Sequence, residues 1–154
     1  MSLTAIHPAP VELIPALIEG LSSADRTELF TLAQGDPSGA LYVALERSSY
    51  SFCYMLGESP AAIGGLIHQE YGKPSQVWMI ASTPRLEHAK KSFLMMSRKE
   101  LREIQRHSDA HKIITAVDCR WRKSIRWLKW LGAKFGEPIK GKAAWFRPFE
   151  IRKR

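Results

Sequence analysis

QVWMIA, at residues 76–81, contains an apolar run from Val77 to Ala81 that predicts a buried central strand. From Pro84 onward, apolar residues recur at a spacing of three to four, which predicts one long helix over about residues 85–107. KIITAV, at residues 112–117, is rich in β-branched residues and predicts a second strand. A strand, a crossover helix and a strand in one sheet form a right-handed unit whose strands are parallel. We therefore expect residues 76–81 and 112–117 to be parallel neighbours.

The segments around this unit predict helices before it, and a helix and a strand after it. A helix begins near Ser22 with acidic residues in its first turn, and Gly35-Asp36-Pro37 ends it. Gly132 ends the last helix, which begins near Arg120. The expected order is helices over residues 10–47, a strand meander over 49–83, and helix–strand–helix–strand over 85–151. This order predicts the α/β (α+β) class, with residues 1–154 forming a single domain around a mixed sheet of about five to seven strands flanked by helices.

The composition is that of an ordinary globular protein. With 154 residues, 45% of them apolar and 25% charged, the chain is long enough to bury a core. Collagen-like, low-complexity and disordered proteins are thereby excluded. No apolar run reaches about 18 residues, and no basic region precedes the first apolar stretch, so we expect neither a membrane span nor a secretory signal. Cys53 and Cys119 lack metal-type spacing; a disulfide between them is possible, but reduced thiols in a cytosolic protein are the simpler expectation.

The charge is distributed unevenly along the chain. The formal net charge is +8, yet residues 1–84 hold three Lys or Arg against eight Asp or Glu. Residues 85–154 hold twenty Lys or Arg against seven Asp or Glu. Such an asymmetry suggests a basic face for an anionic partner: nucleic acid, an acidic protein surface or a phosphate-bearing cofactor. The alternative is a solvated basic surface that only aids solubility.

The run SIRWLKWLGAKFGEP, at residues 124–138, carries a family resemblance. It is similar to the second signature of GNAT acyltransferases, and closer still to the internal virion protein A family of short-tailed phages and its acetyltransferase-like relatives. Those proteins share an apolar strand with glycines after a turn (here residues 59–65) and a Trp-bearing strand that ends in Thr (residues 78–83). The resemblance covers about Ala24 to Phe149. It implies a single GNAT-like domain in which the strand at 112–117 splays from its neighbour to open a cleft.

The resemblance also shows where this chain departs from the enzymes. GNAT enzymes cradle the pyrophosphate of acyl-CoA on a glycine-rich loop, whereas residues 82–89 contain no glycine, and Glu87 places a carboxylate there. Trp121 stands at the position of the family's Asn. Leu128 stands where many of the enzymes have a Tyr that protonates the leaving thiolate, and Leu has no proton to donate. These differences imply a non-catalytic relative without a cofactor.

An enzyme reading stays open and would assign roles to particular residues. Acetyl-CoA would then be the cofactor. Glu70 would be the candidate general base, and Cys119, beside basic residues that lower a thiol pKa, would be a candidate nucleophile. The cofactor-binding residues would be Ile80, Ser82, Thr83, Arg85, His88, Ala89 and Trp121.

The helix near residues 120–131 combines cations with tryptophans. Arg122, Arg126 and Lys129 follow i, i+4, i+7 and predict one basic stripe. Surface Trp and Arg are typical of interface anchors, so this face is a candidate partner-binding site. Alternatively, an amphipathic helix packs its tryptophans on the sheet. The candidate partner-binding residues are Arg120, Arg122, Lys123, Arg126, Trp127, Lys129 and Trp130.

His107 and His111 stand four apart, a spacing that can bind a metal on one helix face. No HExxH pattern accompanies them, and Ser108 and Asp109 indicate that the helix is ending. We expect solvated histidines and no metal.

The sequence therefore leads to three functional hypotheses. The favoured one is a phage-encoded, non-catalytic GNAT-fold protein that acts as an internal virion or virion-assembly protein through its basic C-terminal face. It would meet a phage virion or host protein, in the virion and/or the host cytoplasm. The alternative is an acetyl-CoA-dependent N-acetyltransferase on an unknown amine. Binding of nucleic acid or a polymerase is a third class, and no nucleic-acid motif accompanies it.

Overall fold

A computed structural model of the chain describes residues 2–33, 37–68, 75–107, 112–118, 122–137, 139–140 and 145–152. Its elements are, in chain order, β1 (Thr4–Ile6), η1 (Val11–Leu13), α1 (Ile14–Glu19), α2 (Ser23–Ala33), α3 (Pro37–Arg47), β2 (Tyr50–Leu56), β3 (Ser59–Ile67), β4 (Ser75–Ala81), α4 (Thr83–Glu87), α5 (Lys90–His107), β5 (Lys112–Asp118), α6 (Arg122–Trp130), β6 (Lys134–Phe135), β7 (Ile139–Lys140) and β8 (Trp145–Arg152). The mixed α/β class, and the order of the longer helices and strands, are those that the sequence predicts.

The strands form one mixed sheet in the order β1-β2-β3-β4-β5-β8-β6, with β7 pairing to β8. β4 and β5 are parallel neighbours, as the strand–helix–strand pattern predicts, and the other pairs are antiparallel. Eight strands are described instead of the expected five to seven. The difference comes from short strands at the edges, since β1 has three residues and β6 and β7 have two each, too few to show alternation in a sequence.

The parallel pair opens after its first residues. Ser75 pairs with Ile113 and Gln76 with Ile114 at the start of both strands. On its other side, β4 stays paired with β3 through Ala81, opposite Ala62. Among the described residues, the β5-facing edge of β4 is therefore unpaired after Gln76, which confirms the predicted splay.

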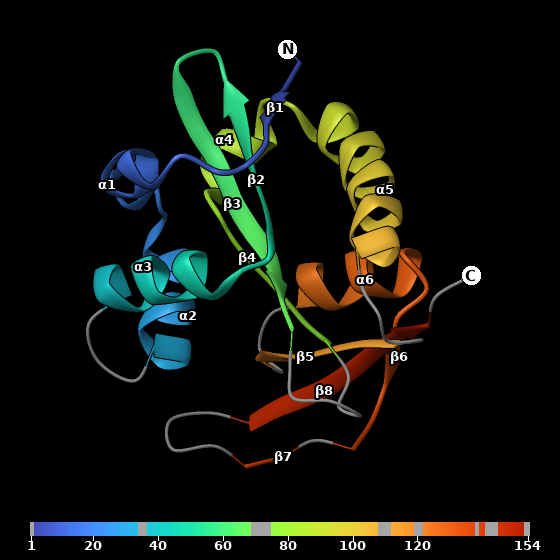
Figure 1. Cartoon of the computed structure of the whole chain (residues 1–154). Coiled ribbons are helices and arrows are strands. Elements are labelled where there is room, and N and C mark those ends of the chain that lie inside the picture. The colour runs from blue at the N-terminus through green and yellow to red at the C-terminus, as the bar shows by residue number, and fades with distance from the viewer. Residues whose placement is uncertain are drawn as a thin grey trace.

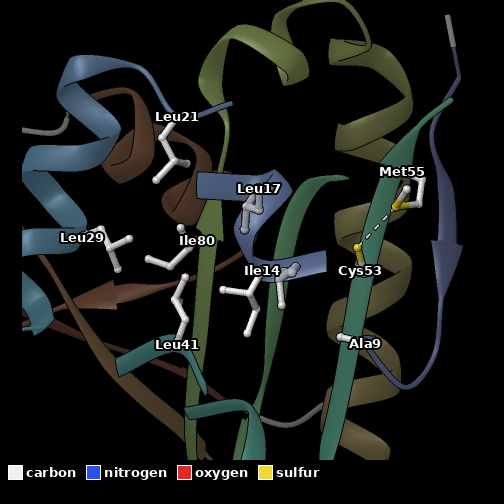
Figure 2. Close-up of a cluster of buried hydrophobic side chains, with 10 residues drawn as sticks. Ala9, Ile14, Leu17, Leu21, Leu29, Leu41, Cys53, Met55 and Ile80 are labelled. Carbon is white, nitrogen blue, oxygen red and sulfur yellow. Dashed lines mark hydrogen bonds between the residues drawn. The ribbon is translucent and has the colours of Figure 1, made fainter. Parts of the chain in front are cut away.

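Helices cover both faces of the sheet (Figure 1). α1, α2 and α3 lie on one side, and α5 and α6 lie on the other. Ile80 of β4 belongs to the core cluster under α1–α3, shown in Figure 2, and Trp78 packs against that cluster. Val77 and Met79 pack against the cluster under α5. A strand that packs on both faces has a continuous apolar run, which explains why residues 77–81 are all apolar.

The long helix expected over 85–107 is divided into α4 and α5. Ser82 caps α4, and Pro84 lies in its first turn, where its missing N–H costs nothing. The helix then tightens, because the His88 N–H donates to the Arg85 carbonyl (3.2 Å) and the Ala89 N–H to the Leu86 carbonyl (2.9 Å). The apolar spacing continues across this turn, so the sequence pattern does not reveal it. In the described part of the chain, no helix has the length and hydropathy that crossing a bilayer requires.

Candidate functional site

A pocket of about 300 Å³ lies on the α5 side of the sheet, at the end of β4 where β5 has turned away. Its wall is mostly apolar. It is lined by Met79 and Ala81 of β4, Thr83, Leu86 and Glu87 of α4, Lys90, Phe93 and Leu94 of α5, and Trp127 of α6. The splay of the two parallel strands thus opens onto a cleft between α5 and α6.

Trp127 forms a fixed part of the pocket wall. Its ring lies 5.4 Å from the Phe93 ring, centroid to centroid, and its Nε1–H donates to Ser97 Oγ (3.2 Å). Ser97 is buried on α5, so this hydrogen bond ties α6 to α5. Trp127 therefore packs against the rest of the fold, which is the alternative that the sequence analysis left open for this helix.

The segment that follows β4 is the one that the resemblance aligns with the pyrophosphate loop of GNAT enzymes, and an acidic side chain of α2 binds to it. The Thr83 N–H donates to Asp25 Oδ2 (2.9 Å), and the Thr83 hydroxyl donates to Asp25 Oδ1 (2.5 Å). Asp25 Oδ2 also accepts from the Ser22 N–H (2.9 Å), and Ser22 Oγ accepts from the Asp25 N–H (3.0 Å). One carboxylate therefore completes the capping of α2 and binds the start of α4.

The neighbouring backbone donors are also engaged. The Ser82 N–H donates to the Ala61 carbonyl (2.7 Å), and the buried Ser82 hydroxyl donates to the Gly20 carbonyl (2.5 Å). Ser82 Oγ accepts from the Arg85 N–H (3.3 Å). Pro84 has no N–H. From residue 82 to residue 85, each backbone N–H is directed at a protein acceptor.

Arg85 points away from the pocket. Its Nη1 donates to the Ala16 carbonyl (3.0 Å) and to the Pro60 carbonyl (2.7 Å), so its guanidinium joins α1 to β3. A Cβ at Gly20 would overlap that guanidinium. These hydrogen bonds engage the guanidinium within the fold, so they give no support to the expected role of Arg85 in cofactor binding.

The other expected cofactor-binding residues are dispersed. Ile80 is buried in the core under α1–α3, and Ala89 is buried under α5. His88 ends α4 and is exposed. Thr83 alone among the described candidates lines the pocket, and Trp121 lies outside the described residues. The sheet alternation that sends Met79 and Ala81 to one face sends Ile80 to the other.

The charged rim of the pocket is close to neutral on the α4 side. Lys90 Nζ lies 2.8 Å from Glu87 Oε2, and both side chains are exposed. Leu128, which the resemblance aligns with the catalytic Tyr of many GNAT enzymes, is buried with Ala133 and Ile151. No proton donor stands at that position.

The cations of α6 are exposed where their side chains are described, at Arg126 and Lys129. Trp130 is 46% exposed, and the Arg98 guanidinium carbon lies 3.9 Å from its ring centroid. The predicted basic face is thus present in part, with Arg98 of α5 as a member that sequence reasoning missed. The side chains of Arg122 and Lys123, and the whole of Arg120, lie outside the described part.

Most of the remaining candidates fall outside the part of the chain that the structure describes. Glu70, Cys119 and His111 lie outside the described residues. His107 is exposed, with Nδ1 2.8 Å from the Glu103 carbonyl oxygen and its ring 4.5 Å from that of Tyr50. No group of three His, Cys, Asp or Glu with metal-site geometry occurs in the part of the chain that the structure describes.

A polar cluster under the other end of α5 has no counterpart in the sequence analysis. Glu100 is only 6% exposed; the Tyr50 hydroxyl donates to its Oε2, and His7 Nε2 lies 3.0 Å from its Oε1. Burial first, and the Glu100 carboxylate second, raise the pKa of Tyr50 above its ordinary value. No local signal could reveal this cluster, since its members are far apart in the sequence.

Comparisons with known proteins identify the fold. No protein-family model and no curated protein matches the chain. A GNAT-family acetyltransferase of Streptococcus pneumoniae has 12% identity and a TM-score of 0.70, covering 98% of this chain and 99% of its own. The ribosomal-protein-S18-alanine N-acetyltransferase of Escherichia coli has 11% identity and a TM-score of 0.64, with coverages of 98% and 94%. An acetyltransferase structure from Salmonella typhimurium, solved with acetyl-CoA, has 12% identity and a TM-score of 0.68, with coverages of 100% and 95%. At these identities the likeness concerns architecture, and the chain has the GNAT acetyltransferase fold.

Proposed function

We propose that this chain is a non-catalytic GNAT-fold protein that acts by binding a partner. The observation that carries the proposal is the hydrogen bond from the Thr83 N–H to Asp25 Oδ2 (2.9 Å). In the enzymes of this fold, as the resemblance describes them, the same part of the backbone binds the pyrophosphate of acyl-CoA. Here the chain supplies its own anion to that place.

The energetic argument concerns what a phosphate would have to displace. Hydrogen bonds to a charged group contribute about 1.5–3 kcal/mol each, and Asp25 accepts two from Thr83 and one from Ser22. A phosphate beside an unmoved Asp25 would meet a like charge. Displacing Asp25 and binding beside it both cost free energy, so both oppose cofactor binding.

Calorimetry with acetyl-CoA tests the proposal. We expect no heat of binding in the micromolar range, which corresponds to about −8 kcal/mol. Micromolar binding by the unmodified chain would overturn it. The matched variant Asp25→Asn keeps the shape of the side chain and removes its charge; if it gains affinity for acetyl-CoA, the carboxylate is the obstacle.

The biological setting that we propose is a phage particle or its assembly. This part rests on the resemblance of SIRWLKWLGA to the internal virion protein A family and on the basic C-terminal half. Peptide mass spectrometry of purified virions, from a phage that encodes this chain, tests it. Detection at a constant copy number per particle supports a virion component, and absence contradicts that role. Normal assembly of a phage that lacks the chain contradicts an assembly role.

A second candidate is an acetyl-CoA-dependent N-acetyltransferase on an amine. The pocket of about 300 Å³ at the opening between β4 and β5 favours it, because such a cleft can hold the acyl end of a cofactor. Release of free thiol from acetyl-CoA in the presence of an amine library measures it. Loss of that release in Glu70→Gln or Cys119→Ala would assign the chemistry to the residues that an enzyme requires.

A further inference from the structure

The pocket continues onto an apolar surface of α5 and α6. Leu94 lines the pocket and is 39% exposed, and the adjacent Met95 is 71% exposed. On α6, Trp130 follows Trp127 by one turn and is 46% exposed. Exposed large apolar side chains beside a concave apolar pocket mark interaction sites more often than an isolated exposed residue does.

Cations surround this apolar surface. Lys90, Lys91, Arg98 and Lys99 of α5 and Arg126 and Lys129 of α6 are all exposed. The acidic residues described on these helices do not balance them, because Glu100 is buried against Tyr50 and His7, and Glu103 lies 2.7 Å from Arg106. Lys90 is offset by its ion pair with Glu87, so the excess positive charge beside the pocket comes from the other cations of α5 and α6.

We infer that the pocket between β4, α4, α5 and α6 is the docking site for an acidic segment of a partner protein, which inserts a bulky apolar side chain. This inference rests on the proposed function, since a cofactor would use the same space. A cavity of about 300 Å³ is at the small end of ligand sites, and it suits one or two large side chains. The partner's carboxylates would meet the surrounding cations, and its apolar anchor would meet Leu94, Phe93 and Trp127.

Two other classes of anionic partner fit these observations less well. Single-stranded nucleic acid binds by stacking bases on open aromatic faces, yet one face of Trp130 is covered by the Arg98 guanidinium. An anionic membrane favours a broad convex surface that lies along its plane, whereas Leu94 and Phe93 lead into a hollow. Apolar anchors in pockets surrounded by charged rims are the usual arrangement of protein–protein hot spots.

The test is selection of peptides from a random yeast-displayed library against the immobilised full chain, followed by fluorescence polarisation with the recovered peptides. We expect peptides in which Asp and Glu surround a Trp, Phe or Leu. Leu94→Gln, which removes the apolar lip, and Lys91→Glu, which reverses one cation, should each weaken binding at least about tenfold. Circular dichroism verifies that each variant is folded.

Matched controls lie on the opposite side of the sheet. Val43→Gln alters a residue of α3 that is 52% exposed, and Arg47→Glu reverses an exposed cation of the same helix. Both should leave the affinity within about twofold, because surface changes outside a hot spot are near neutral. Recovery of no peptides, of peptides without the acidic–apolar pattern, or of peptides indifferent to Leu94→Gln overturns the inference.

Two further measurements separate this inference from the proposed function. If acetyl-CoA binds with micromolar affinity, the proposed function fails and the pocket is a cofactor cleft. If neither acetyl-CoA nor acidic peptides bind, the proposed function stands and the inference falls. Flotation with phosphatidylserine vesicles provides the last comparison, because vesicle binding that Leu94→Gln leaves unchanged assigns the cations to a membrane surface instead.

Discussion

Asp25 Oδ2 lies 2.9 Å from the backbone nitrogen of Thr83, although 58 residues separate the two in the sequence. The same oxygen accepts from the Ser22 N–H, so the first turn of α2 and the first turn of α4 share one carboxylate. Helix N-termini attract anions through their unpaired N–H groups and their dipole. In this chain the anion is part of the protein.

Replacing Asp25 by Ala should destabilise the chain by about 2–4 kcal/mol, because Thr83 and Ser22 both lose a charged acceptor. The free energy of unfolding in urea measures this loss. The control is Glu46→Ala, at an exposed position of α3, which should change that free energy by less than about 0.5 kcal/mol. Equal effects of the two substitutions would show that the shared carboxylate contributes nothing special.

Gly20→Ala should also destabilise, against the ordinary preference of helical backbone for Ala over Gly. The backbone at Gly20 has φ −84° and ψ −2°, which Ala adopts without strain. The added Cβ would nevertheless displace the Arg85 guanidinium from the Ala16 and Pro60 carbonyls, a loss of about 1–3 kcal/mol.

A double-mutant cycle in urea checks this mechanism. Arg85→Met removes the guanidinium, so Gly20→Ala in that background should be neutral or stabilising by up to about 1 kcal/mol. If the two substitutions are simply additive, the guanidinium is not what opposes a side chain at Gly20.

Tyr50→Phe should cost about 1–3 kcal/mol, because the buried Glu100 carboxylate loses the hydroxyl that donates to it. Thermal and urea unfolding both report the loss. Tyr42→Phe provides the comparison, since Tyr42 is 39% exposed on α3 and water replaces its hydroxyl. If Tyr50→Phe leaves the free energy of unfolding unchanged, solvent or another group reaches Glu100 in place of the hydroxyl.

Cys53 makes the stability fall in alkali. Burial raises the pKa of its thiol from 9.0 to about 11, because the thiolate is disfavoured in the core. Between these two values the unfolded chain has lost a proton that the folded chain retains, so the contribution is complete below pH 9 and is lost as the pH rises toward 11. At about 1.4 kcal/mol per pKa unit, the loss is on the order of 2–3 kcal/mol.

The variant Cys53→Ala isolates the contribution of the thiol. The buried tyrosines are present in both proteins, so the effect of their titration cancels when the two unfolding free energies are subtracted. The difference in unfolding free energy between the wild type and the variant should shrink steadily above pH 9. Native Cys53 should also be slow to react with a thiol reagent at neutral pH, since it is fully buried. A difference that does not change with pH would contradict the assigned cause.

The sequence predicted the fold well where the apolar spacing within a single segment shows whether that segment is a helix or a strand. The apolar run at 77–81, the β-branched run at 112–117 and the helix between them predicted the parallel pair. The division of α4 from α5 stayed hidden, because the turn at His88 preserves the apolar spacing. Edge strands of two or three residues carry no pattern to read.

The candidate site was predicted less completely, because its decisive contacts join residues far apart in the chain. The sequence reveals that residues 82–89 lack glycine, but it does not reveal that Asp25 takes the Thr83 N–H. The capping pattern near Ser22 predicts only the contact of Asp25 with Ser22 at the start of its own helix. Arg85 looked like a phosphate ligand by type and position, whereas its partners are the carbonyls of Ala16 and Pro60.

The short ladder between β4 and β5 makes the sheet mechanically two sheets joined at a seam. Two residue pairs, at Ser75 and Gln76, connect a half formed by β1–β4 to a half formed by β5–β8, and the Trp127–Phe93 contact bridges the two above it. Sub-global opening follows the boundaries with the fewest interactions. Amide protons of β8 should therefore exchange with solvent as one cooperative unit, through an opening that leaves those of β3 protected, and a ligand held across the seam should merge the two units into one.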